Sequence, residues 1–229
     1  MPRHSELQRP AVANIDQVIV VIAAKSPDPN LLLTDRLLLA GEYARIPVTL
    51  CINKCDLDEA SAEQYREIYK KAGFSVISLS AKNNTGIDTL KAVLKGKITA
   101  LAGPSGVGKS SLLKAVAPEY DFAVGAVSKK IGRGRHTTRH SSLLLIDYNT
   151  YVVDTPGFSV LEFSRIPPTE LGSYFPDIAI HMGHCKFSSC LHSVEPECPV
   201  LVAVKSGEIS SSRYESYMTI LNEIKQKRR

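Results

Sequence analysis

Residues 103–110 read Gly103-Pro104-Ser105-Gly106-Val107-Gly108-Lys109-Ser110. A glycine, four residues and then Gly-Lys-Ser is the pattern of a phosphate-binding loop, and this pattern requires a strand before it and a helix after it. The apolar run at 98–102 and the helical spacing at 110–116 supply both elements. The stretch therefore predicts a nucleotide-binding α/β fold rather than a chance glycine-rich turn.

The residue types of this loop suit a chain of phosphates. Gly106 and Gly108 let the backbone curl so that successive N–H groups face one concavity, and the N-terminus of the following helix adds its positive end. We expect Lys109 to reach the β- and γ-phosphates and the Ser110 hydroxyl to bind Mg²⁺. We also expect Ser111, the next residue, to contact the nucleotide.

The chain alternates apolar runs of strand length with longer amphipathic stretches from Asp16 onward. Buried strands are expected where both faces are apolar, at 18–22, 48–52, 76–79 and 98–102. Helical spacing lies between them at 31–45, 59–72 and 87–94. Two more strands, at 143–146 and 151–153, are joined by a turn at Asn149. The alternation predicts an α/β fold with a mostly parallel sheet and helices on both faces.

Two short motifs indicate which base the nucleotide carries. The first, Asn53, Lys54, Cys55 and Asp56, ends a predicted strand. The Asp56 carboxylate can accept hydrogen bonds from both the N1–H and the amino group of guanine, and adenine offers no such pair of donors. Because a buried carboxylate without partners is costly, this residue can reject ATP. The second motif, which supports the base, is formed by Ser80, Ala81 and Lys82.

A further motif follows the strand at 151–153 and reads Asp154-Thr155-Pro156-Gly157. It places a carboxylate at the carboxyl end of a strand, where ligands bind in open α/β sheets. We expect Asp154 to hold Mg²⁺ through its water shell and the Gly157 N–H to contact the γ-phosphate.

The order of these motifs is unusual, because the two base motifs precede the phosphate loop. In Ras-like GTPases the phosphate loop comes first and the base motifs last. A cut in one loop and a join between the old termini would give the observed order with the same sheet. The sequence thus resembles a circularly permuted P-loop GTPase.

The segment 132–139 lies between the phosphate loop and Asp154, where the first switch loop of a GTPase falls. Thr137 and Thr138 both qualify as the threonine that completes Mg²⁺ coordination. Phe158 stands where Ras-like enzymes carry the glutamine that orients water. His136 is the candidate replacement, as a base or a water-positioning group, with contact to phosphate or RNA as the alternative. We therefore expect slow hydrolysis by the chain alone, accelerated by a partner.

A metal site is indicated in the last third of the chain. Cys185, Cys190, His192 and Cys198 follow the spacing Cys-x4-Cys-x-His-x5-Cys. Three thiolates and one imidazole complete a tetrahedron without an open position, so the expected ion is one structural Zn²⁺. His181 or His184 could replace His192. The other two cysteines, Cys51 and Cys55, are read as a buried thiol and a variable position of the guanine motif.

Charge and hydropathy point to a partner and a compartment. The formal net charge is +5, with five basic residues and no acidic one between 125 and 140, and four more near the end at Lys225, Lys227, Arg228 and Arg229. This favours a polyanionic partner. The longest apolar run, residues 18–24, is far shorter than the roughly 20 residues of a membrane span. We expect a cytoplasmic monomer without a membrane partner.

Taken together, these motifs and the segment Arg9-Pro10-Ala11-Val12-Ala13-Asn14-Ile15-Asp16-Gln17 resemble the RsgA (YjeQ) family of GTPases. The resemblance implies GTP and GDP as ligands, and the small ribosomal subunit and its rRNA as partners in late subunit assembly. It also implies an N-terminal OB-fold, a permuted GTPase domain and a helical zinc domain. We expect 1–14 to be a remnant or linker, because an OB barrel cannot be built from it. We expect residues 15–163 to form the GTPase domain and residues 164–229 the zinc domain.

Two other functions remain open at this point. Gly103-Pro104-Ser105-Gly106 with a later Thr-Thr-Arg is also found in guanylate-type kinases. A zinc-containing RNA-binding module with a vestigial nucleotide site is the second alternative.

The expected domain boundary near Phe163 further predicts that removing zinc unfolds the C-terminal part and spares the α/β part.

Overall fold

The computed structural model describes residues 14–119, 142–154 and 163–228. Its central sheet has six strands in the order β3-β2-β1-β4-β6-β5. The strands are β1 (Gln17–Ala23), β2 (Val48–Asn53), β3 (Ser75–Ser78), β4 (Ile98–Ala102), β5 (Ser142–Asp147) and β6 (Thr150–Asp154). All neighbouring pairs are parallel except β5 and β6, which form an antiparallel hairpin at one edge. The mostly parallel α/β sheet expected from the sequence is confirmed.

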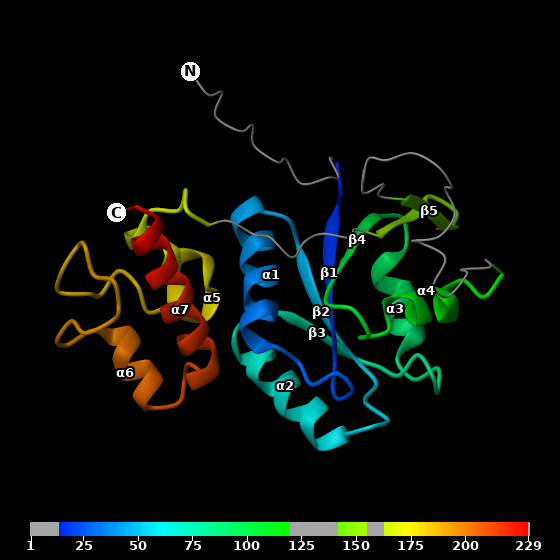
Figure 1. Cartoon of the computed structure of the whole chain (residues 1–229), viewed down its shortest axis with the longest axis horizontal. Helices are drawn as coiled ribbons and strands as arrows, with labels where there is room; N and C mark the ends of the chain where they lie inside the picture. The colour runs from blue at the N-terminus through cyan, green and yellow to red at the C-terminus, as the bar shows by residue number, and fades with distance from the viewer. Residues whose placement is uncertain (1–13, 120–141, 155–162, 229) are drawn as a thin grey trace.

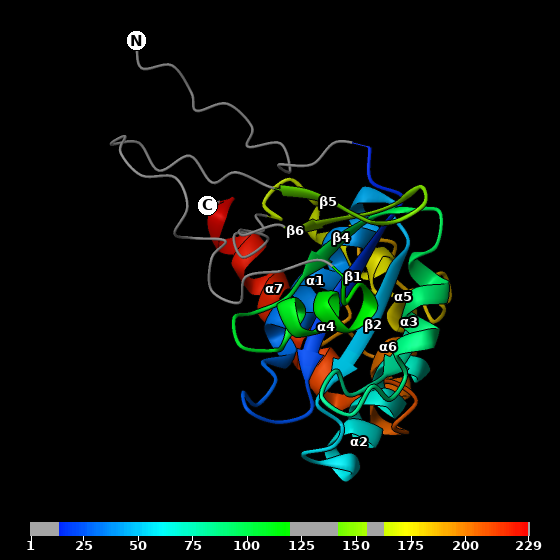
Figure 2. The ribbon, with the colours of Figure 1, turned by 90° about the vertical axis from the view of Figure 1, so that its right-hand side faces the viewer.

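Both faces of the sheet are covered by helices, as Figure 1 and Figure 2 show. Along β1, Val18 and Val20 pack into the cluster that contains buried residues of α1 (Leu31–Ala44) and α2 (Glu59–Lys71). Ile19 and Val21 point the other way, into the cluster with α3 (Ile87–Leu94) and α4 (Lys109–Val116). Because both faces of β1 are buried, its side chains do not alternate between apolar and polar, and this explains the continuous apolar run at 18–24.

Helices α1 and α2 begin after residues whose side chains accept a hydrogen bond from a free N–H group of the first turn. Asn30 caps α1 by accepting a hydrogen bond from the Leu33 N–H at 2.9 Å. Asp58 caps α2 in the same way, accepting from the Ser61 N–H at 3.0 Å. Both caps lie in loops that follow carboxyl ends of parallel strands, β1 and β2. The two helices on this face of the sheet therefore start at the edge where ligands bind in folds of this class.

The C-terminal part is helical and packs beside α1 (Figure 1). It contains the 3-10 helix η2 (Pro168–Tyr174) and three α-helices, α5 (Pro176–Ala179), α6 (Pro199–Lys205) and α7 (Ser211–Lys227). The sequence predicts the last helix only at 214–224, and it misses the three shorter ones because four to seven residues carry no measurable periodicity. Each of these three starts with proline at its first turn, a signal that sequence reasoning could have used. No helix in the described ranges is long and apolar enough to cross a membrane.

Arg213 of α7 joins the C-terminal part to the sheet domain. Its guanidinium donates to Asp35 of α1 at 2.6 Å and to both carboxylate oxygens of Asp177 at 2.7 and 3.1 Å. The three side chains are only 1–3 % exposed. Aromatic rings flank the guanidinium, with centroid distances of 4.9 Å to Phe175, 5.4 Å to Phe74 and 5.8 Å to Tyr69. We call Arg213, Asp35, Asp177 and these three rings the Arg213 junction.

Replacing Arg213 is expected to destabilise the protein strongly. Arg213→Met leaves two buried carboxylates without their cation, and breaking a buried ion pair from one side costs about 3–5 kcal/mol. The free energy of unfolding measured with urea should fall by that amount. Arg66→Met is the control, because Arg66 pairs with Glu63 on the surface. An equal loss of stability in both variants would contradict the role given to the junction.

Candidate nucleotide and metal sites

The guanine motif, its companion motif and the phosphate loop meet at the carboxyl edge of the sheet. They follow β2, β3 and β4 respectively, and these strands are parallel. The Asn53 side chain bridges all three: its Nδ2 donates to the Val107 carbonyl at 2.8 Å, and its Oδ1 accepts from the Ala81 N–H at 3.2 Å. Asn53 itself is only 1 % exposed. Segments scattered along the chain are thus fixed to one another by one amide.

Lys54 adds a second link to the phosphate loop. Its ammonium group donates to the Gly106 carbonyl at 2.7 Å and also to the Ser26 carbonyl. Ser26 lies in the loop between β1 and the start of α1. The Lys54 ammonium group therefore links the guanine motif to the phosphate loop and to the loop that contains Ser26.

Two glycines of the phosphate loop are required by close approach of other groups. A Cβ on Gly103 would lie 2.2 Å from the Val21 carbonyl oxygen, and one on Gly108 would lie 2.4 Å from Asn53 Nδ2. Both glycines also have positive φ, 145° and 96°. With Gly106 at φ 83°, the loop has the left-handed residues that turn successive N–H groups toward one concavity. This geometry fits the phosphates of a nucleotide.

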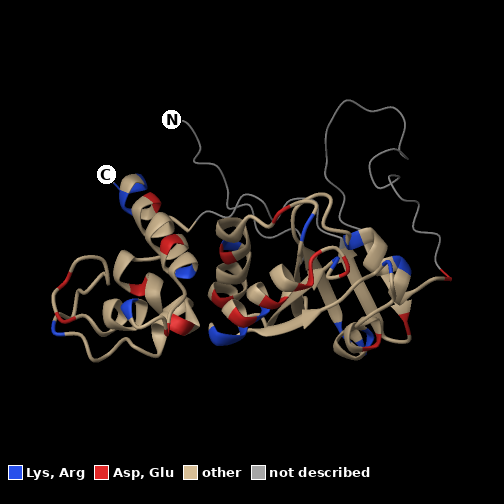
Figure 3. Ribbon diagram, turned by 90° about the horizontal axis from the view of Figure 1, so that it is seen from below, with Lys and Arg blue, Asp and Glu red and all other residues tan. Residues whose placement is uncertain are grey.

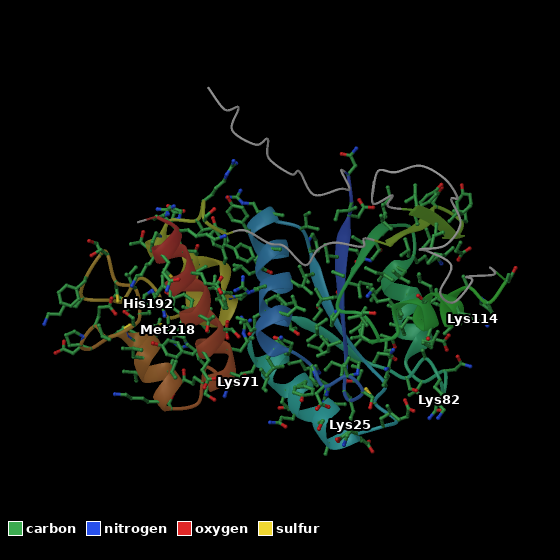
Figure 4. All side chains as sticks on the ribbon, in the orientation of Figure 1. Lys25, Lys71, Lys82, Lys114, His192 and Met218 are labelled. Carbon is green, nitrogen blue, oxygen red and sulfur yellow. The ribbon has the colours of Figure 1, made fainter. Side chains whose placement is uncertain are left out.

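Asp56 is oriented by the companion motif. The Ser80 hydroxyl donates to Asp56 Oδ1 at 2.5 Å and accepts from the Asn83 N–H at 3.2 Å. The hydrogen bond from Ser80 therefore fixes the Asp56 carboxylate relative to the companion motif, which Asn53 also contacts at Ala81. The third residue of the companion motif, Lys82, lies on the same side of the molecule as Lys25, as Figure 4 shows.

The residues expected at the phosphates are only partly described. Lys109 Nζ donates to the Gly103 and Pro104 carbonyls at 2.8 and 2.9 Å, so its charge lies against the loop. Lys109 is also the first residue of α4, one position earlier than the sequence predicts, with Ser110 and Ser111 in the same first turn. Asp154 is the last residue of β6. The remaining candidates, His136, Thr137, Thr138 and Gly157, and also Phe158, lie outside the described residues.

The Cys/His motif forms a cluster that fits a metal ion. The ligand atoms of Cys185, Cys190, His192 and Cys198 all lie within 4.8 Å of one another. His192 Nδ1 is 3.6 Å from Cys185 Sγ and 3.4 Å from Cys198 Sγ, and Cys190 Sγ is 3.8 Å from Cys198 Sγ. Zinc bonds of about 2.3 Å to sulfur and 2.0 Å to nitrogen in a tetrahedron give separations of about 3.5–3.8 Å. The alternatives lie elsewhere, since His181 pairs with Glu208 at 3.7 Å and His184 is exposed outside the cluster.

Residues around this cluster hold its loop in place. Burial opposes ionisation of Glu195, but hydrogen bonds from the Leu191, Ser193 and Val194 N–H groups outweigh it and lower its pKa to about 2. From α7, the Tyr214 hydroxyl donates to the His192 carbonyl at 2.8 Å. Sequence reasoning misses these residues, because an acid in a polar loop and tyrosines on a helix carry no distinctive spacing.

Basic side chains gather at the end of α7, where Figure 3 shows Lys and Arg at the C-terminus. Lys225 and Lys227 occupy the last turn, and Arg228 donates to the Ser164 and Arg165 carbonyls at 3.2 Å each. The other basic segment that the sequence singles out, between 125 and 140, lies outside the described residues. A positive surface of this kind suits a polyanion.

Gly108→Ala should weaken nucleotide binding at least tenfold, because the new methyl group would displace the Asn53 amide from the loop. The measurement is the equilibrium affinity for a fluorescent GDP analogue. Gly96→Ala is the matched control: Gly96 also has positive φ, at 72°, but its Cβ would meet nothing within 4 Å. Both variants carry the same kind of backbone strain, of about 1–2 kcal/mol. Equal affinities in the two variants would argue against the Asn53 brace.

Cys198→Ser should reduce the zinc content of the purified protein from one ion per chain to near zero, since serine does not replace a thiolate ligand of zinc. Atomic absorption spectrometry measures the content directly. Cys55→Ser serves as the control, because Cys55 lies in the guanine motif and donates to the Ile52 carbonyl. Zinc retained by the Cys198 variant would refute the assigned ligand set.

Comparisons with known proteins agree with this geometry. The sequence model of the family described as "RsgA GTPase" matches residues 1–164. A protein named "Small ribosomal subunit biogenesis GTPase RsgA" from Ruminiclostridium cellulolyticum is 45% identical over 225 residues, covering 98% of this chain and 74% of the relative. A protein of the same name from Clostridium botulinum is 46% identical over 224 residues, covering 97% and 77%.

Solved structures give the same result. YjeQ from Thermotoga maritima superposes with a TM-score of 0.78 at 41% identity, covering 98% of this chain and 76% of that one. YloQ, described as a circularly permuted GTPase, gives a TM-score of 0.76 at 35% identity, covering 99% and 74%. The permuted order inferred from the motifs is thereby confirmed, and so is the enzyme class. The chain belongs to the RsgA GTPase family.

Proposed function

We propose that this chain hydrolyses GTP to GDP and phosphate at the carboxyl edge of its sheet, as a partner of the small ribosomal subunit. The observation that carries the proposal is the Asn53 side chain, which ties the guanine motif to the phosphate loop at Val107 and to the companion motif at Ala81. A nucleotide must be held at its base and its phosphates at once. One buried amide supports both ends of that site.

Guanine selectivity is assigned to Asp56. The Ser80 hydroxyl fixes one carboxylate oxygen, so that the group can accept from the N1–H and amino group of guanine. ATP lacks this pair of donors and would leave a carboxylate unsatisfied. Lys54 supports the same site by holding the phosphate loop at Gly106.

At the phosphates, the backbone N–H groups of residues 105–111 bind the phosphate oxygens, and Lys109 neutralises charge on the β- and γ-phosphates. Ser110, Asp154 and either Thr137 or Thr138 are the residues assigned to Mg²⁺. When bound, the ion neutralises charge that develops on the phosphate oxygens. We assign to His136 the role of orienting the attacking water, because the chain has Phe158 where Ras-like enzymes carry the glutamine with that role.

The zinc assigned to Cys185, Cys190, His192 and Cys198 has a structural role. Four protein ligands leave no open position for water or substrate, so the ion stabilises its loop instead of catalysing a reaction. The buried positions of Cys190, His192 and Cys198 support this assignment.

The partner is inferred from the relatives. The curated relatives are named for biogenesis of the small ribosomal subunit, and this chain spans about three quarters of their length. The net charge of +5 is compatible with rRNA. A monomer acting in the cytoplasm is the form we propose. The family match does not favour the kinase or the vestigial RNA-binding module.

Two measurements test the proposal. Steady-state GTP hydrolysis should be slow alone and at least tenfold faster with small ribosomal subunits, since groups supplied by a partner raise the rates of other GTPases by about 10³–10⁵. No acceleration would contradict the ribosomal role. ADP formed from GMP and ATP would instead identify a kinase.

Asp56→Asn should shift base preference from guanine to xanthine, because the amide presents a donor to the carbonyl that xanthine has in place of the amino group. Competition between GDP and xanthosine diphosphate for a fluorescent analogue measures the shift. The matched control is Asp58→Asn, two residues away, where asparagine can still cap α2. An unchanged preference in the Asp56 variant would refute the assignment of the base site.

A further inference from the structure

The C-terminal part is attached to the sheet domain through a buried surface. At the Arg213 junction, Asp35 and Tyr69 come from α1 and α2, and Asp177 and Phe175 come from the C-terminal part. Leu39 of α1 belongs to the same apolar cluster as Ile220 and Cys198. Unfolding the C-terminal part alone would therefore leave apolar surface of α1 and α2 uncovered.

The helices that meet Arg213 begin at the nucleotide loops. The loop before α1 contains Ser26, which accepts a hydrogen bond from Lys54 of the guanine motif. The cap of α2, Asp58, lies two residues after Asp56 and pairs with Lys25 at 3.3 Å. Asp35 follows the cap of α1 by five residues, so little more than one helical turn separates the junction from the loop.

On the other side, the same helix that carries Arg213 supports the metal loop. Tyr214 and Tyr217 of α7 donate to the carbonyls of His192 and Leu191, at 2.8 and 2.9 Å. Figure 4 shows His192 in the C-terminal part, well away from Lys25 and Lys82 at the nucleotide edge. Within the stretch 213–217 of α7, Arg213 thus contacts the helices that start at the nucleotide loops, and Tyr214 and Tyr217 contact the metal loop.

From these contacts we propose that the zinc-bearing C-terminal part and the nucleotide-binding sheet open as one cooperative unit, joined by Arg213, so that bound GDP protects the zinc. The inference rests on the proposed nucleotide and zinc sites. It replaces the expectation from the sequence that zinc loss unfolds the C-terminal part and spares the sheet.

The test is the rate at which a chromophoric chelator removes zinc from the full chain, with and without GDP. A ligand that binds only the folded state lowers the population of an opened state by about 100-fold at 100 times its Kd. If zinc leaves through the joint opening, saturating GDP should slow release at least tenfold. A release rate that changes less than twofold with GDP would overturn the inference.

Asp35→Asn isolates the junction, because it removes the charge of the residue across the interface while the bonds from Arg213 to Asp177 stay in place. The variant should still bind GDP and zinc, and the protection of zinc by GDP should fall at least threefold. Glu223→Gln is the control, because Glu223 pairs with Arg36 across the same interface but is 44 % exposed. If GDP slows zinc release equally in the wild type and in Asp35→Asn, Arg213 does not couple the two parts. Should Asp35→Asn fail to fold, the wild-type comparison alone decides.

Failure of the inference is distinguishable from failure of the proposed function. The GDP affinity and the zinc content of the wild-type chain are measured first. A chain that binds no GDP or contains no zinc contradicts the proposed function. A chain that binds both but releases zinc at a rate independent of GDP contradicts only the coupling.

Discussion

The position of the Asn53 side chain is the constraint on which the nucleotide site depends. Its amide satisfies a carbonyl of the phosphate loop and an N–H of the companion motif at the same time. A side-chain amide donates from its nitrogen and accepts at its oxygen, and these two atoms are held in one plane. Because Asn53 is buried, loss of either bond would leave a polar group without water, so the loops are held in one arrangement.

The elements that the sequence predicts correctly are those with strong local signals. β1 is a run of seven buried residues, and the phosphate loop carries its own glycine spacing. The Arg213 junction has no local signal in α7, since one arginine on an amphipathic helix usually faces water. A clue was present in α1, where Asp35 and Arg36 interrupt an apolar stretch at 31–40. A charged residue at a buried position of a helix, such as Asp35, predicts a partner from another element, but not which one.

The packing connects the C-terminal part that holds the Cys/His cluster with the sheet that holds the proposed nucleotide site. An isolated helical part of about sixty residues has a small core, and its apolar cluster is completed by Leu39 of α1. The sheet domain in turn has Tyr69 and Phe74 covered by the C-terminal part at Arg213. Each part supplies surface that the other needs.

The permuted order of the motifs follows from the same geometry. The proposed nucleotide site lies at the carboxyl ends of β2, β3, β4 and β6, and the side-by-side order of these strands in the sheet does not depend on which strand comes first in the chain. With β1 as the first described strand, different loops are continuous, but the order of the strands in the sheet is unchanged. In this order β6 precedes the C-terminal part, whose first described residue, Phe163, is buried in the apolar cluster that contains Cys190 and Cys198. The permuted order therefore preserves the arrangement of the proposed nucleotide-binding residues, while the part that holds the Cys/His cluster follows the strand that ends at Asp154 in the chain.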